Sequence, residues 1–380
     1  MSDVSQIYQI VNEVAEQTLG ESAIAVVDTG SFVSLGDKVL SSATDTDSFL
    51  KTLVDRIGKT VYSIRRYMSD SRSMVRHSFE FGCIVQKIYV DLPSAKENNT
   101  WNIGEADYEP KFAPIFKPSA KQKLFNKIST WEIDVTIPDT LFKTAFLNEI
   151  NMATFIDAIF TAQENMMELA LENNEDLTRA NFIAKKLHSA KPCGAINLLT
   201  SYNTLTNKTL TVDSCLRDVD FLKWASMTIN LWSLRIRRMS TLFNDEGYKR
   251  FTPREELVIN VLDNFATATA SYLESDTYHK ELVSLPRYER VPYWQGSGTS
   301  YDFDDVSKIH VKLDDTTTVE QTGVIAVMYD YQAMGVTLTD MRSASERNNH
   351  DEYANYYNKA NIGYFNDMSE NGIVFYIAET

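Results

Sequence analysis

The sequence predicts an α+β protein in which helices pack against a sheet of buried strands, and three observations support this class. Residues 131–137 alternate apolar and polar side chains, which is the pattern of a strand with one buried face. Apolar residues recur at helical spacing from Met152 to Met167. Two short runs, 324–329 and 373–378, are apolar on both faces and are expected to pair as buried strands of one central sheet.

The composition argues against several classes of protein. Acidic residues number 52 against 37 basic ones, and the formal net charge of -15 repels a phosphate backbone over most of the surface, so a dedicated DNA-binding protein is not expected. The cysteines, Cys83, Cys193 and Cys215, are widely spaced and odd in number, which fits neither a disulfide framework nor a four-ligand zinc site. No signal peptide or bilayer-spanning stretch is recognised, so neither secretion nor membrane insertion is expected.

The first part of the chain is expected to be extended. Residues 1–47 have helical content near 7–17 and little pattern afterwards, which is typical of an arm lying on other material. Residues 48–58 place apolar side chains on one helical face and predict a short amphipathic helix. From 60 to 137, strand signals alternate with polar tracts and predict a long hairpin that projects from the body.

The second part is expected to contain the longest helix and the core. Helical spacing runs from 139 to 186, and Pro138 before it suits a helix start. A domain boundary is expected near 191–195, where Pro192 and Gly194 interrupt the pattern. The elements predicted after it are a helix at 216–243, a strand at 257–262, a helix at 263–273 and a loop at 293–305.

One short motif has the form of an active site. Asp28, Thr29 and Gly30 follow two apolar residues, as in the active-site turn of aspartic proteases. That chemistry needs two carboxylates that share a proton, and the chain holds one copy, so a protease would require a symmetric dimer. A short motif outside its structural context is weak evidence for catalysis.

The remaining motifs predict no catalytic, cofactor-binding or metal-ligating residue. The run 296–298 (Gly-Ser-Gly) lacks the lysine of a phosphate-binding loop. The acidic residues Asp302, Asp304 and Asp305 lack the ligand spacing of an EF-hand, so a solvated loop is favoured over a calcium site. The five histidines form no HxxxH or HExxH pair, and no serine or cysteine nucleophile signature is present. An enzyme is therefore not expected.

Opposite charges occur in the first arm of the predicted hairpin, the acidic group later in that arm than the basic one. The basic group is Arg65, Arg66, Arg72 and Arg76, and the acidic group is Glu105, Asp107 and Glu109. Because a projecting hairpin has few neighbours in its own subunit, these groups are candidates for contacts between subunits, and a merely solvated face explains them equally well.

Four stretches carry a family resemblance. They are SFLKTLVDRIG at 48–58, TLFKTAFLN at 140–148, NMATFIDAIF at 151–160 and GYFNDMSENGIVFYIA at 363–378. They resemble the major capsid (head) proteins of tailed bacteriophages, closest to those of small short-tailed picovirus-type podophages. The order of elements likewise resembles the tailed-phage major capsid fold, which is Hong Kong 97-like.

The resemblance implies a division of the chain. The implied parts are an N-terminal arm at 1–47, a short helix and extended loop at 48–137, a peripheral domain with a long spine helix at 138–190, an axial domain at 191–322, and closing strands of the peripheral domain at 323–380.

The resemblance also implies a function without catalysis or cofactor. The chain is expected to self-assemble as pentamers and hexamers into an icosahedral or prolate head that encloses double-stranded DNA. The expected partners are further copies of the chain, scaffolding and portal proteins, and packaged DNA bound without sequence specificity. The expected location is the virion capsid, after assembly in the host cytoplasm. Two alternatives stay open: an encapsulin-type compartment of the same fold, and an aspartic protease built on Asp28.

Overall fold

The computed structural model describes residues 4–20, 23–40, 48–49, 52, 74–76, 85–93, 119–126, 128–138, 149–189, 191, 193–276, 288–295 and 306–379. The chain forms two compact units. The first comprises 1–72, 128–174 and 338–362, and the second comprises 73–127, 175–337 and 363–380. Three elements have residues in both units: α5 (Glu149–His188), β11 (Met334–Asn348) and β12 (Tyr353–Asn366). The division into arm, extended loop, peripheral and axial domains stays a prediction.

The first unit contains two N-terminal helices with a core of their own. The helix predicted near 7–17 is confirmed as α1 (Val4–Leu19), but the expectation of little structure after it is wrong, because α2 (Thr29–Leu40) follows. Their shared core includes Val14, Phe32 and Leu35. The sequence of α2 contains glycine, serine and β-branched residues, which favour helix weakly, so packing stabilises this helix more than propensity does.

The short helix expected at 48–58 lies mostly outside the described residues. Ser48, Phe49 and Thr52 are helical, and Thr52 Oγ1 donates to the backbone oxygen of Ser48 at 2.9 Å. Phe49 is fully buried in the same core as α1 and α2.

A four-stranded sheet has the order β1-β11-β12-β4, where β1 is Val75–Arg76 and β4 is Ile128–Pro138. The predicted alternation at 131–137 is confirmed in β4, since Ile137 is buried while Asp134 is exposed. Pro138 is the last residue of β4, and the helix start expected directly after it falls on residues outside the described part of the chain.

Two long strands of this sheet, β11 and β12, were missed by the sequence interpretation. Their composition is polar, and apolar periodicity alone does not identify such strands. Cross-strand polar pairs connect β4 to β12. Thr136 Oγ1 donates to Asn355 Oδ1 at 2.7 Å, and Glu132 lies 3.0 Å from Lys359.

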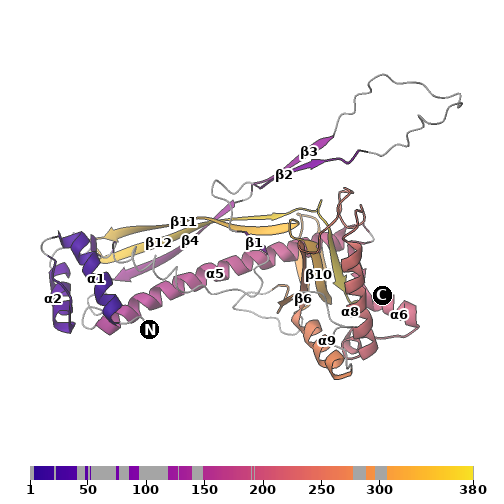
Figure 1. Cartoon of the computed structure of the whole chain (residues 1–380), viewed down its shortest axis with the longest axis horizontal. Helices are drawn as coiled ribbons and strands as arrows, with labels where there is room; N and C mark the ends of the chain where they lie inside the picture. Colours follow the sequence, from indigo (N-terminus) through magenta and orange to yellow (C-terminus); the bar gives the residue numbers. More distant parts are fainter. Residues whose placement is uncertain are drawn as a thin grey trace, which may run out of the picture. The chain divides into compact units, whose positions relative to one another are not determined.

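A five-stranded sheet with the order β5-β13-β10-β6-β7 lies in the second unit (Figure 1). The two apolar runs pair as predicted, because β10 (Val324–Asp330) is antiparallel to β13 (Gly372–Tyr376). The flanking strands are β5 (Ala195–Asn197), β6 (Leu257–Leu262) and β7 (Glu289–Val291). A separate two-stranded sheet pairs β8 (Ile309–Lys312) with β9 (Thr318–Gln321).

Both faces of the five-stranded sheet are buried. On one face, Met328 and Phe375 join a core with helices α6 (Leu198–Thr206), α8 (Val219–Arg235) and α9 (Asp263–Asp276). On the other face, Val327 and Val374 join a core that includes Phe182 of α5. The uniformly apolar sequences of β10 and β13 follow from this double burial.

The helices of the second unit partly match the prediction. The strand at 257–262 and the helix after it are confirmed as β6 and α9. The helix predicted at 216–243 is shorter, because Asp218 caps α8 by accepting from the Phe221 backbone N–H at 2.8 Å and the helix ends at the C-cap Ile236. A separate short helix, α7 (Val212–Cys215), precedes it.

The longest helix is confirmed as α5, which has 40 residues (Figure 1). Its described part begins at Glu149, ten residues after the predicted start at 139, and residues 139–148 lie outside the described ranges. Near its end, the fully buried Lys186 donates to the Phe243 backbone oxygen at 3.1 Å and lies 3.4 Å from Asp245. Burial lowers the pKa of Lys186, and the Asp245 carboxylate opposes that shift.

Candidate functional site

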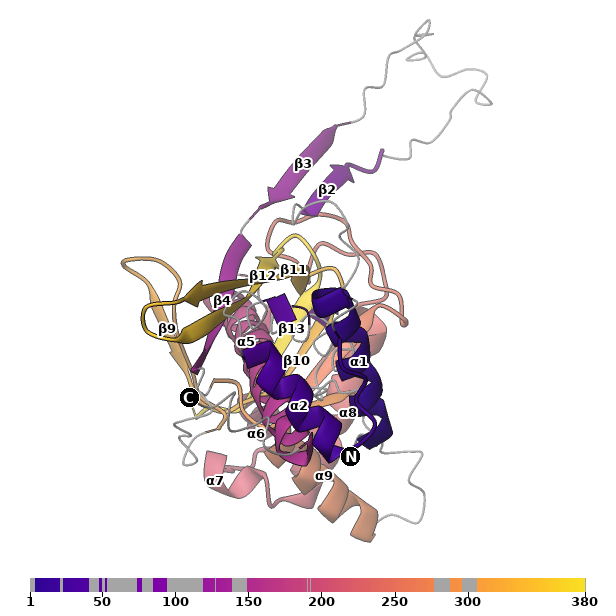
Figure 2. The same ribbon diagram turned by 90° about the vertical axis from the view of Figure 1, so that its left-hand side faces the viewer.

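The region predicted to form a hairpin contains an antiparallel ribbon of β2 (Val85–Val90) and β3 (Ala120–Phe125), seen side by side in Figure 2. The register runs from Val85 opposite Phe125 to Val90 opposite Ala120. Strands are therefore confirmed here, while residues 94–118 between them lie outside the described part of the chain.

Each face of this ribbon carries side chains that depart from the usual apolar-inside pattern. Residues directly opposite in an antiparallel pair share a face, and successive residues alternate. One face presents Ile88, Val90 and Leu124, which are 65%, 58% and 59% exposed. The other face carries Lys87, Tyr89 and Lys123, and there Tyr89 is buried. Lys87 and Lys123 therefore point toward the protein together with aromatic side chains, and three apolar side chains are exposed on the opposite face beside two glutamines.

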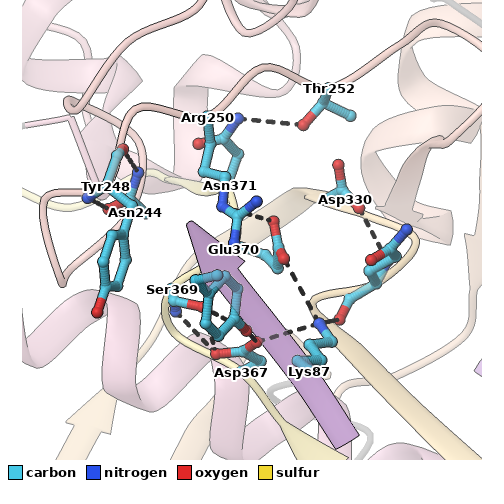
Figure 3. Close-up of polar contacts among 12 residues, drawn as sticks. Lys87, Asn244, Tyr248, Arg250, Thr252, Asp330, Asp367, Ser369, Glu370 and Asn371 are labelled. Atoms are coloured by element: carbon cyan, nitrogen blue, oxygen red, sulfur yellow. Dashed lines mark hydrogen bonds and ion pairs between the residues drawn. The ribbon is translucent and has the colours of Figure 1, made fainter. Parts of the chain in front are cut away.

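Asp367, which follows β12, is the centre of the contacts on the charged face (Figure 3). Its carboxylate lies 3.0 Å from Lys87 Nζ and 3.3 Å from Lys123 Nζ. It accepts hydrogen bonds from the Tyr89 hydroxyl, from the Ser369 backbone N–H at 3.0 Å and from Ser369 Oγ at 2.7 Å. We call Lys87, Tyr89, Lys123, Asp367, Ser369 and Glu370 the hairpin clamp.

Glu370 extends the clamp toward the segment after α8. It lies 3.6 Å from Lys87 Nζ and 3.7 Å from Arg250 Nε. The Arg250 guanidinium stands 4.4 Å from the centroid of the Tyr89 ring, and Tyr89 stacks on Tyr248 at 5.5 Å. Ion pairs, a cation–π contact and aromatic stacking thus fix the base of the ribbon.

The pKa shifts follow from this arrangement. Burial disfavours ionisation of Asp367, but the Lys87 ammonium and the hydrogen bonds from Tyr89 and Ser369 outweigh it and lower its pKa to about 2. Burial raises the pKa of Tyr89, and its bond to Asp367 adds to the shift, so the phenol stays protonated. Burial also raises the pKa of Glu370, although Lys87 and Arg250 oppose that shift.

The clamp holds a structure together and shows no feature of a catalytic centre. Its hydroxyl groups donate to a carboxylate, and its carboxylates are occupied by ammonium and guanidinium groups. Among the residues that the structure describes, no group of three histidine, cysteine, aspartate or glutamate side chains is placed to hold a metal ion. No described helix is long and apolar enough to cross a membrane.

The structure places one of the seven charged residues predicted as contacts. Arg76 lies in β1, where its backbone pairs with Thr337 of β11. The others, Arg65, Arg66, Arg72, Glu105, Asp107 and Glu109, lie outside the described residues. Sequence reasoning missed the clamp residues, although Lys87-Ile88-Tyr89-Val90 alternates polar and apolar side chains and gave a usable signal.

The protease-like motif has a structural role. Asp28 precedes α2 and accepts hydrogen bonds from the Ser31 backbone N–H at 2.8 Å and from Ser31 Oγ at 2.7 Å. Ser31 Oγ accepts in return from the Asp28 backbone N–H at 3.0 Å, so the two residues form a capping box. The bonds from Ser31 lower the pKa of Asp28. Asp28 therefore caps a helix, and the protease alternative is not favoured.

The other candidate motifs are only partly described. The run 296–298 and the acidic residues Asp302, Asp304 and Asp305 lie outside the described ranges. Two of the three cysteines, Cys193 and Cys215, are free thiols, and burial raises the pKa of Cys215 to about 11.

Comparison with known proteins shows the family. The sequence profile described as Phi29-like phage major capsid protein matches residues 8–376. The major capsid protein of Bacillus phage PZA is 22% identical over 238 residues, covering 60% of this chain and 50% of that protein. The major capsid protein of Bacillus phage GA-1 is 25% identical over 195 residues, covering 50% and 39%. The chain thus spans about half the length of these relatives or less.

A solved structure supports the fold. A chain in the structure of the head fiber and inner core protein gp22 of native bacteriophage P68 aligns with a TM-score of 0.52 at 10% identity, over 80% of this chain and 83% of that one. The predicted α+β tailed-phage capsid fold is confirmed. The matching profile describes a structural protein of the phage capsid. The chain belongs to the Phi29-like phage major capsid protein family.

Proposed function

We propose that this chain self-assembles as pentamers and hexamers into an icosahedral or prolate head enclosing double-stranded DNA. Its partners in this proposal are further copies of itself, scaffolding and portal proteins, and DNA bound without sequence specificity, with assembly in the host cytoplasm. Family membership supports the shell, since the matching profile describes a major capsid protein.

The observation that carries the proposal is the exposed apolar face of the β2–β3 ribbon. Ile88, Val90 and Leu124 form it, and the clamp on the opposite face fixes its direction. Contiguous exposed apolar side chains mark interaction sites, and burying them in a contact gains about 25 cal/mol per Å². A second copy of the chain is the partner that a shell supplies at every position.

The charged residues predicted as contacts remain part of the proposal. In an assembled shell the arginines of one hairpin arm would pair with acidic side chains of another subunit. These residues are Arg65, Arg66, Arg72, Arg76, Glu105, Asp107 and Glu109. The axial domain at 191–322 and the peripheral domain at 138–190 and 323–380 are proposed on the same basis of family likeness.

The test compares shell formation by the natural chain with that of Ile88→Gln/Val90→Gln. The matched control is Leu205→Gln on α6, since Leu205 is 67% exposed and lies outside the ribbon. We expect the natural chain and the control to form shells, seen by sedimentation velocity and electron microscopy. The double variant should remain as folded, unassembled subunits with an unchanged circular dichroism spectrum.

Two results would count against the proposal. Normal shells from the double variant would show that the ribbon face is not a contact. A natural chain that stays a small oligomer even with its scaffolding partners would reject shell formation itself. Particles that hold an enzyme instead of DNA and lack a portal would favour the encapsulin-type alternative.

A further inference from the structure

Helix α8 is apolar on two opposite faces. Its inner face, which includes Phe221, Leu222 and Ile229, is fully buried in the core of the second unit. On its outer face Met227, Leu231 and Leu234 follow one another at helical spacing and are 60%, 42% and 51% exposed. Exposed apolar side chains that lie next to one another mark interaction sites, so the outer face is a candidate contact surface.

The exposed apolar surface continues beyond the helix. An isolated bridge between Ser240 and Arg250 places Met239 opposite Phe251. Arg250 is directed inward to Glu370, and its neighbour Phe251 is 52% exposed. Leu242 is also 52% exposed. We call Met227, Leu231, Leu234, Met239, Leu242 and Phe251 the α8 surface.

The charge around this surface is opposite to that of the chain as a whole. Residues 227–254 include six basic and two acidic residues, while the full chain has a net charge of -15. Arg235 and Arg238 are exposed beside the apolar stripe. Another copy of the chain is predominantly acidic, so it offers complementary charge to the rim of an apolar contact.

We propose that the α8 surface docks onto a second copy of this chain, at a contact distinct from that of the β2–β3 ribbon. This inference rests on the proposed shell, because a ring of identical subunits with head-to-tail contacts requires more than one kind of surface on each copy. Nucleic acid is a poorer occupant, since phosphates are bound by charge and the centre of this surface is apolar. The apolar stripe forms the centre of the contact, and the arginines form its rim.

The test combines substitution with photo-crosslinking. In the double variant Leu231→Gln/Leu234→Gln, the protein concentration needed to form shells should rise at least about tenfold. The matched control is Leu177→Gln on α5, since Leu177 is 52% exposed and Leu234 is 51% exposed. Circular dichroism of the unassembled variants checks that the subunit remains folded.

Photo-crosslinking identifies the occupant even if the double variant folds poorly. A chain with p-benzoylphenylalanine in place of Leu231 is assembled from a mixture of ¹⁵N-labelled and unlabelled subunits and irradiated. Cross-linked peptide pairs that join one labelled and one unlabelled chain are the expected product.

Cross-links only within one chain, only to DNA or only to another protein would overturn the inference, as would a double variant that assembles like the control. If the natural chain forms shells and the inference still fails, the proposed function stands. If the natural chain forms no shells, the inference and the proposed function are both refuted.

Discussion

The hairpin clamp gives the sharpest prediction, and Asp367→Asn is the perturbation that tests it. The substitution keeps the shape of the side chain and removes its charge. Lys87 then loses its partner at 3.0 Å, although its side chain is only 10% exposed. Lys123 loses its contact at 3.3 Å in the same change. Lys87 keeps Glu370 at 3.6 Å and Lys123 keeps Glu246, so the expected cost lies toward the lower end of that for a buried cation left without an anion.

The magnitude follows from two independent arguments. The pKa of Asp367 falls from 3.8 to about 2 on folding, which corresponds to about 2 kcal/mol of stability at neutral pH. Removing one partner of a buried pair costs roughly 3–5 kcal/mol. We therefore expect Asp367→Asn to lower the free energy of unfolding by about 2–4 kcal/mol at pH 7.

The pH dependence of this loss has a definite sign. The pKa of Asp367 is lower in the folded chain than in the unfolded one, so its stabilisation is complete above about pH 5 and is largely lost as the pH falls to about 2. The difference in unfolding free energy between the natural chain and Asp367→Asn should therefore shrink steadily between about pH 5 and pH 2.

The assay is urea unfolding of the unassembled subunit, with amide exchange in β2 and β3 as the local measurement. Asp315→Asn is the control, because Asp315 pairs with Lys312 at the same 3.0 Å but is fully exposed, and it should change little. Equal losses for the two substitutions, or a loss that persists unchanged at pH 2, would refute the electrostatic reasoning.

Three further predictions concern the second unit. Gly323→Ala should destabilise the chain far more than Gly247→Ala in urea unfolding. Both glycines have a positive φ, so the backbone strain is similar. A Cβ on Gly323 would clash with a backbone oxygen after β13, while a Cβ on Gly247 would meet no atom within 4 Å. Asn197→Ala should cost about 1–2 kcal/mol in the same assay, because Asn197 caps α6 and also bonds the backbone after β13. The Cys215 thiol should react with iodoacetamide much more slowly than that of Cys193 in peptide mapping at pH 8, because burial raises its pKa to about 11.

The sequence predicted those parts of the fold in which apolar periodicity and burial coincide. Helix α5 packs one apolar face against the core, and strands β10 and β13 pack both faces, so all three have that property. The strands β11 and β12 were missed, because polar residues are frequent in both and interrupt the apolar pattern. Helix α2 escaped detection for a related reason, as glycine and serine weaken its intrinsic signal.

The candidate site was less predictable than the fold. Charges were expected to matter in the hairpin, but the pairs that the structure describes join the ribbon to Asp367 and Glu370, which are more than 200 positions away in the sequence. Contacts of that kind depend on the three-dimensional fold and leave no local pattern. The opposite error occurred at Asp28, where a local sequence motif suggested catalysis. In the structure this residue caps a helix.

The exposed apolar face of the β2–β3 ribbon connects subunit stability to assembly. Burying a side chain such as Ile88 or Val90 gains about 1.5–3 kcal/mol each. In the observed arrangement that stabilisation becomes available only when another molecule covers Ile88 and Val90. Amide protection in the ribbon should thus rise on assembly, because binding stabilises the state that binds.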